Sequence, residues 1–101
     1  MTFVMYCGNR HSHGCSHRKT ESRMLSDLLV LELASVLAGP SVGQFFAEQG
    51  ATVLKIENPR TGGDVTRRWR VPGASEADAS DDRSAYFCCC NHGKRSLALD
   101  L

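Results

Sequence analysis

The sequence predicts an α/β fold, and three neighbouring segments carry that prediction. Residues 28–33 (LLVLEL) form a nearly continuous apolar run of strand length, which is typical of a parallel strand buried on both faces. A small-residue turn, Ala38-Gly39-Pro40, then opens a helical pattern, and residues 52–56 (TVLKI) return as a second strand. A strand, a helix and a strand in this order predict a partial Rossmann-like βαβ unit with parallel strands.

Length, charge and cysteine usage limit the classes of protein to be considered. The 101 residues permit one small domain. A formal net charge of +1 gives no electrostatic reason to expect nucleic acid, and no apolar run approaches the ~20 residues of a membrane span. The five cysteines, three of them consecutive, do not resemble a disulfide framework, because adjacent cysteines cannot each reach a well-oriented partner. We therefore expect a cytoplasmic protein that binds neither nucleic acid nor membrane.

Residues 1–24 differ in kind from the remainder of the chain. They show no sustained periodicity and carry five residues of the two types that most often bind zinc, namely Cys7, His11, His13, Cys15 and His17. Structural zinc sites normally pair their ligands at short, regular spacings, whereas these cysteines are eight residues apart and the histidines alternate. We expect a disordered or non-native extension without metal. A zinc cluster and an organelle transit peptide are the alternatives.

The helical segment of the unit begins at the small-residue turn. Pro40 suits a first-turn position because its missing N–H is not needed there. Val42, Phe45, Phe46 and Gln49 recur at helical spacing and share one face. Gly50 then stands where a left-handed residue usually ends a helix.

The turn between the first strand and the helix is a candidate anion site. Its small residues let the backbone approach a ligand, and the helix N-terminus offers unpaired N–H groups to anionic oxygens. The G-x-G-x-x-G fingerprint of dinucleotide-binding domains is absent, so a plain turn is the alternative. Glu32, near the end of the first strand, is interpreted as a polar side chain emerging at the sheet edge.

Residues 61–83 form a long connection without a dominant period. Two interpretations of its first part stay open. Arg67, Arg68 and Arg70 form a basic patch suited to phosphates, or Asp64 caps a short helix at Thr66 in a solvated turn. The acidic residues 76–82 are expected to form a solvated tip.

The last third of the chain predicts a buried segment, a basic turn and a third strand. Residues 84–90 (SAYFCCC) suit a buried strand or the entry to a helix, and we expect the cysteines to pack rather than to act as nucleophiles with His92. The turn at residues 91–96 (NHGKRS) places two adjacent cations, Lys94 and Arg95, where they can meet phosphates. The alternation in residues 97–101 (LALDL) predicts the third strand.

Four segments in register resemble the beginning of a family III CoA-transferase, the group that includes formyl-CoA transferase and carnitine CoA-transferase. They are the AGP turn, the GATVLKIE strand, the GGDVTRRW segment and the NHGKRSLALDL ending, and they span nearly all of the chain after the head. The resemblance implies that residues 25–101 are the incomplete N-terminal α/β part of a larger CoA-transferase domain.

The resemblance also implies a ligand and a set of contact residues. Family members move coenzyme A between carboxylic acids, so acyl-CoA and a carboxylic acid are the expected partners, together with a second copy in an interlocked homodimer. The family's nucleophilic aspartate has no counterpart in this chain, so no catalytic residue is assigned. The residues that the family pattern places at coenzyme A are Val36, Leu37, Ala38, Asn58, Arg60, Lys94, Arg95, Leu99 and Asp100.

One of these positions departs from the family pattern. Asn58 stands where family members often have an arginine that packs on the adenine, and Arg60 is the nearby guanidinium able to stack in its place. Two other classes remain as alternatives. One is a small non-catalytic module that binds CoA or an adenine nucleotide, and the other is a metal or redox protein that uses the Cys/His-rich head.

Overall fold

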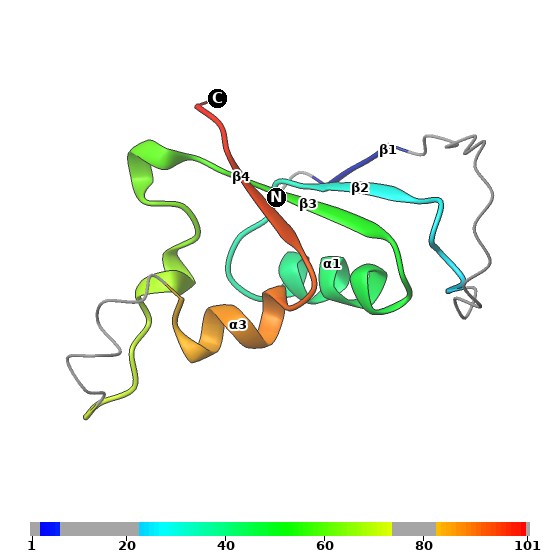
Figure 1. Ribbon diagram of the computed structural model, residues 1–101. Coiled ribbons are helices and arrows are strands. Elements are labelled where there is room, and N and C mark those ends of the chain that lie inside the picture. Colours follow the sequence, from blue (N-terminus) through cyan, green and yellow to red (C-terminus); the bar gives the residue numbers. More distant parts are fainter. Residues whose placement is uncertain (1–2, 7–22, 74–82, 101) are drawn as a thin grey trace, which may run out of the picture.

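The computed structural model describes residues 3–6, 23–73 and 83–100 (Figure 1). The Cys/His-rich part of the head and the acidic residues 76–82 lie outside the described residues, so the expectations for them stay expectations. Among the described residues, no helix combines the length and apolar character that a membrane span requires.

Three parallel strands make up most of the sheet, as the sequence predicted. β2 (Leu29–Glu32) pairs with β3 (Thr52–Glu57), and β3 pairs with β4 (Arg95–Ala98). Glu32 lies opposite Lys55, which brings an acidic and a basic side chain of neighbouring strands to the same level. β4 begins two residues earlier than the predicted third strand, because the turn after the preceding helix is already complete at Lys94.

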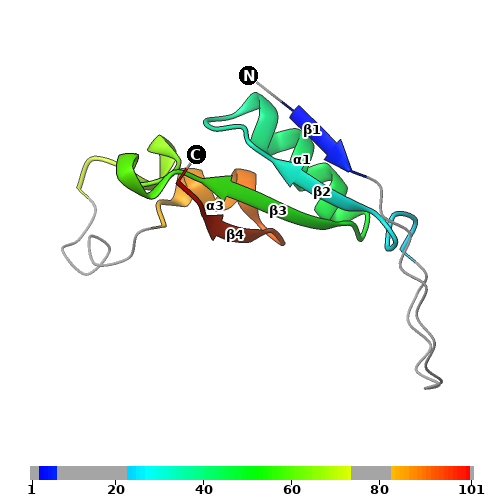
Figure 2. The same cartoon turned by 90° about the horizontal axis from the view of Figure 1, so that it is seen from above.

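A fourth strand was not predicted. β1 (Phe3–Tyr6) pairs antiparallel with β2, with Phe3 opposite Glu32 and Tyr6 opposite Leu29. It lies along the edge of β2 that faces away from β3 (Figure 2). For these four residues the expectation of a disordered extension is corrected, because they form part of the sheet.

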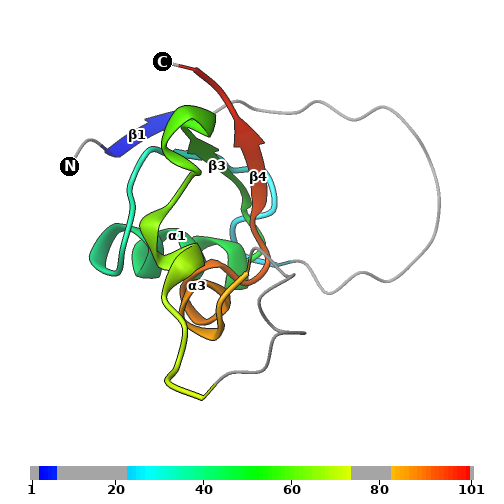
Figure 3. The same ribbon diagram turned by 90° about the vertical axis from the view of Figure 1, so that its left-hand side faces the viewer.

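Two helices cover one face of this sheet. α1 (Ala38–Glu48) connects β2 to β3, and α3 (Ala85–Asn91) precedes β4. Figure 3 shows both helices on the same side of the sheet. Between β3 and α3 the chain makes two short 3₁₀ helices, η1 (Pro59–Thr61) and η2 (Val65–Arg68). The architecture is therefore a small α/β layer, as expected.

The local signals for helix ends are confirmed. Pro40 lies in the first turn of α1, and Gly50 follows its end with φ +99° and an N–H bonded to Ala47 O. Asp64 caps η2 through the Thr66 N–H, as one of the two interpretations held, but Asp64 and Thr66 are buried, so the turn is not solvated at these residues. The segment predicted as a strand or the entry to a helix forms the helix α3, and the Ser84 hydroxyl caps it by accepting from the Phe87 N–H.

The buried face of α1 differs from the face that the apolar spacing suggested. Val42 and Phe45 are about half exposed, whereas the buried residues of the helix are Gly39, Pro40, Gly43 and Ala47. Small residues are needed there because α1 lies close to the sheet. The cluster of buried apolar side chains is correspondingly small and consists of Val30, Ala47, Ala51 and Val53, with Leu25, Leu28 and Phe46 packed against it.

Candidate functional site

The turn that leads from β2 into α1 is held by a strained residue. Val36 has φ +72°, in the left-handed region that a β-branched side chain rarely adopts. Its N–H donates to both carboxylate oxygens of Asp64, at 3.3 Å each. Strain of this kind costs of order 1–3 kcal/mol and persists where surrounding contacts fix the backbone, often at binding sites.

Asp64 connects this turn to the sheet. Its carboxylate, nearly inaccessible to solvent, forms an ion pair with Lys55 at 2.9 Å and accepts from the N–H and hydroxyl of Thr66. Burial alone would raise the pKa of Asp64. The bonds from Thr66 and Lys55 outweigh that effect and leave this pKa below its ordinary value.

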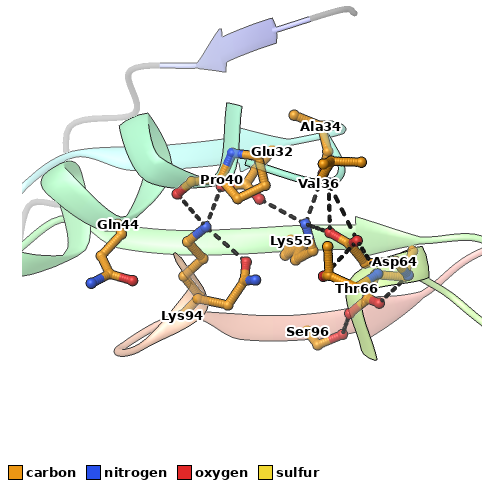
Figure 4. Close-up of polar contacts among 12 residues, drawn as sticks. Glu32, Ala34, Val36, Pro40, Gln44, Lys55, Asp64, Thr66, Lys94 and Ser96 are labelled. Carbon is orange, nitrogen blue, oxygen red and sulfur yellow. Dashed lines mark hydrogen bonds and ion pairs between the residues drawn. The ribbon is translucent and has the colours of Figure 1, made fainter. Parts of the chain in front are cut away.

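Glu32 holds two lysines at the centre of the molecule. Its Oε1 accepts from Lys55 Nζ at 2.9 Å and its Oε2 from Lys94 Nζ at 2.8 Å, and all three side chains are at most 2 % exposed (Figure 4). Lys94 also donates to Pro40 O at 2.7 Å and Asn91 Oδ1 at 2.9 Å. Burial lowers the pKa of Lys94, and the contact with Glu32 offsets part of that decrease.

Glu57 forms the other half of the polar interior. Its carboxylate accepts from Arg67 Nε and Nη2, at 2.8 and 2.7 Å, and from Ser96 Oγ. Its Oε2 also accepts from the Asp64 N–H at 2.9 Å. The guanidinium of Arg67 lies 3.9 Å from the centre of the Phe87 ring, which brings α3 against the same cluster.

These contacts form one network from β4, through β2 and β3, to η2. Acidic and basic side chains are balanced in number, namely Glu32, Asp64 and Glu57 against Lys55, Lys94 and Arg67. Within the described part of the chain, no buried side-chain nitrogen or oxygen lacks a hydrogen-bond partner. A satisfied network of this kind fixes the positions of its elements. Its role here is to hold the segments at the carboxyl ends of the strands.

The pKa of Glu57 gives a testable consequence for stability. Burial raises this pKa, but the bonds from Arg67, Ser96 and Asp64 N–H lower it to about 2. An unfolded glutamate titrates near 4.3. The folded state therefore gains stability above that pH, of order 3 kcal/mol, and loses it as pH falls towards 2. We expect Glu57→Gln to have a lower free energy of unfolding than the parent chain at pH 7. Between pH 5 and pH 2, its free energy of unfolding should fall less steeply than that of the parent.

Urea unfolding at several pH values measures this decline. The matched control is Glu48→Gln, which changes an exposed glutamate at the end of α1. A Glu57→Gln profile parallel to that of the parent chain would show that Glu57 does not contribute in this way.

Seven of the nine predicted contact residues lie at the carboxyl ends of the strands. Asn58 follows β3 and caps η1, where its Oδ1 accepts from the Arg60 N–H at 2.9 Å. Arg60 forms an ion pair with Asp100, and the Leu99 N–H donates to Glu57 O at 2.9 Å. The structure thus brings together Val36, Leu37 and Ala38 after β2 with Asn58 and Arg60 after β3, and Leu99 and Asp100 after β4.

The other two predicted residues lie elsewhere. Lys94 and Arg95 stand at the amino end of β4, with Arg95 opposite Leu54 of β3. The ammonium group of Lys94 is turned inward to Glu32, so it is not presented at the edge that carries the other seven. The arrangement expected for this pair, at the same edge as the β2 turn, is therefore corrected.

Two of the cavities beside the network adjoin predicted contact residues. One, of about 260 Å³, lies at the carboxyl ends of β2 and β3 and is lined by residues that include Ser35, Asn58, Thr61 and Asp64. The other, of about 310 Å³, lies between β4 and α3 and is lined by residues that include Arg67, Phe87, Cys88 and Arg95. Lys55 contributes to both. Of the nine predicted contact residues, Asn58 lines the first cavity, and Lys94 and Arg95 line the second.

The network itself was missed by sequence reasoning. Glu32 was interpreted as a residue emerging at the sheet edge, yet it is fully buried. The available signal was an acid in one apolar strand and Lys55 in the next strand of the same unit. No group of three or more His, Cys, Asp or Glu side chains suited to a metal ion occurs within residues 23–73 and 83–100.

Comparison with known proteins agrees with the motif pattern. The profile of CoA-transferase family III matches residues 25–101. The chain is 51 % identical over 77 residues to a succinate–glutarate CoA-transferase of Agrobacterium fabrum, covering 76 % of this chain and 19 % of that protein. It is 47 % identical over 77 residues to a succinyl-CoA:mesaconate CoA-transferase of Haloarcula hispanica, covering 76 % and 18 % of the two chains.

A formyl-CoA:oxalate CoA-transferase of Afipia carboxidovorans is 37 % identical over 79 residues, covering 78 % of this chain and 17 % of that protein. The chain spans about a fifth of the length of these curated relatives. No solved structure gives a significant match. Because the family profile covers most of the chain, the chain belongs to CoA-transferase family III.

Proposed function

We propose that this chain is the N-terminal, coenzyme-A-contacting part of a CoA-transferase that moves coenzyme A from an acyl-CoA to a carboxylic acid. The family membership supports the reaction class. The observation that carries the site is the clustering of the Val36 turn, η1 and the end of β4 at one edge of a parallel sheet. Ligands of open α/β sheets bind outside the carboxyl ends of the strands.

In this proposal the buried network positions the site and does not bind the ligand. Asp64 fixes the strained Val36 backbone, and Lys94 acts through Glu32 to hold β2 and α1 in place. Val36, Leu37, Ala38, Asn58, Arg60, Leu99 and Asp100 are the proposed contacts. Arg95, exposed at the start of β4, is a further proposed phosphate contact from the second cavity.

The chemical step is proposed to depend on residues outside residues 1–101. In a carboxylate mechanism, the nucleophile attacks the thioester carbonyl, coenzyme A leaves as its thiolate, and an acyl anhydride is formed. Asp64 is unsuited to this role because Lys55, Thr66 and the Val36 N–H already bind its oxygens. The proposal includes a larger Rossmann-like domain, an interlocked homodimer and a cytoplasmic location.

Binding of coenzyme A by the chain tests the site. We expect Arg60→Ala to weaken binding about three- to tenfold at low salt, because it removes a cation from the proposed edge and leaves Asp100 unpaired. The matched control is Arg23→Ala, which removes an exposed arginine beside Gly50, before the amino end of β3.

Isothermal titration calorimetry on samples with matching circular dichroism spectra gives the comparison. An equal loss of affinity in both variants would mean that non-specific electrostatic attraction, and not this edge of the sheet, accounts for the binding of coenzyme A. Binding by the parent chain without thioester exchange would be expected both for a part of a transferase and for a non-catalytic binding module. A fusion of the parent chain to the remaining length of a relative distinguishes these two alternatives. Thioester exchange by the fusion would indicate a part of a transferase, and its absence would indicate a binding module.

A further inference from the structure

The three consecutive cysteines of α3 are not used by the proposed function. Cys88 and Cys89 are exposed and Cys90 is buried at 4 % exposure. The sulfur atoms of Cys89 and Cys90 lie 3.4 Å apart, and the Cys89 thiol donates to Tyr86 O at 3.0 Å. Cys89 and Cys90 thus form a pair of adjacent thiols, one accessible and one against the interior.

The backbone of α3 opposes a disulfide between these two thiols. Consecutive Cα atoms joined by a trans peptide are about 3.8 Å apart, whereas disulfides usually need about 4.4–6.8 Å. Closing an S–S bond of about 2.05 Å would therefore distort the helix. The pair is better suited to a third atom that bonds to both sulfurs, since the two sulfurs can then remain further apart.

The number of thiols limits which atom can bridge them. Structural zinc normally takes four protein ligands, and the described residues supply no third His, Cys, Asp or Glu to this pair. Trivalent arsenic that carries one organic group needs two sulfurs. The two sulfurs, which lie 3.4 Å apart, can both bond to such a centre without a further protein ligand.

The protonation of Cys90 is compatible with this chemistry. Burial and the neighbouring Cys89 thiol raise the pKa of Cys90, which favours its protonated thiol. Reaction with an organoarsenic oxide uses the proton of each thiol. The two S–H bonds and the arsenic–oxygen bond break, two S–As bonds form, and one water leaves, without any change in oxidation state.

We propose that Cys89 and Cys90 form a dithiol site for monosubstituted trivalent arsenicals, and that Cys88 is not part of it. The site goes beyond the proposed transferase function and does not depend on it. We therefore expect one arsenical to bind per chain, at the last turn of α3.

Phenylarsine oxide is the probe, and the intact mass of the full chain is the measurement. Because Cys7 and Cys15 lie outside the described residues, the parent protein carries Cys7→Ser and Cys15→Ser. We expect this parent to gain one phenylarsenic group per chain and to release it to an excess of a small dithiol. Cys89→Ser should show no adduct in the intact mass, because its affinity for phenylarsine oxide should be at least tenfold weaker.

Cys88→Ser is the matched control, because it removes an exposed thiol of the same helix. We expect it to retain one adduct with unchanged affinity. No adduct on a folded parent, an adduct retained in Cys89→Ser, or an adduct lost in Cys88→Ser would each overturn the proposal. Since Cys89 and Cys88 are both exposed, neither serine variant is expected to unfold the chain, and circular dichroism verifies this.

Discussion

Lys94→Met is expected to lower the free energy of unfolding by about 3–5 kcal/mol, the usual cost of breaking a buried ion pair by removing one partner. Methionine keeps the length of the side chain but supplies no donor. Glu32 Oε2, Pro40 O and Asn91 Oδ1 would then be left without the ammonium group that binds all three. Guanidinium unfolding followed by circular dichroism measures the change.

The neighbouring residue provides a matched control. Arg95→Met removes a cation one position away, but Arg95 is exposed, so the expected change is within about 0.5 kcal/mol. Similar losses in the two variants would contradict the assignment of Lys94 to the interior. A Lys94→Met chain as stable as its parent would show that the network does not hold β2 and α1.

Gly43→Ala is expected to destabilise the chain by several kcal/mol although alanine favours helices. A Cβ at this position would lie 1.8 Å from Glu32 Oε2 and 3.2 Å from Lys94 Nζ. Either α1 must move away from the sheet or Glu32 must leave its two lysines, and a broken buried pair alone costs about 3–5 kcal/mol. The helix propensity of alanine returns only about 1 kcal/mol.

Glu48→Ala is the control for this substitution, because it places alanine at an exposed position of the same helix. It should leave the unfolding midpoint nearly unchanged. If Gly43→Ala were as stable as the parent, the close approach of α1 to Glu32 would not exist in solution.

The sequence predicted the central layer because its signals are local. The apolar run at β2, Pro40 in the first turn of α1 and Gly50 after its end depend on neighbours in the chain, and each has its expected place. The α3 segment was ambiguous because its aromatic and cysteine residues suit strands and helices alike. In the structure this segment is a helix whose first turn is capped by the hydroxyl of Ser84.

Contacts between distant segments could not be predicted in the same way. Lys94 and Glu32 are 62 residues apart, and only the parallel pairing of three strands and the Gly43 helix face brings their side chains together. A lysine beside an arginine in a turn suggested two exposed phosphate ligands. The structure separates their roles, because one side chain is inside and the other outside. The pairing of β1 with β2 is likewise a long-range contact without a sequence signal.

We propose that the carboxyl edge of the parallel sheet contacts coenzyme A, and the amide NMR spectrum of the isotope-labelled chain, recorded with and without the ligand, tests this claim residue by residue. We predict that shifts will concentrate at Val36, Leu37, Ala38, Asn58, Arg60, Leu99 and Asp100, while Arg23 and Gly50 at the opposite end stay unchanged. Shifts confined to the amino ends of the strands, or no shifts in a spectrum that shows the folded sheet, would contradict the claim.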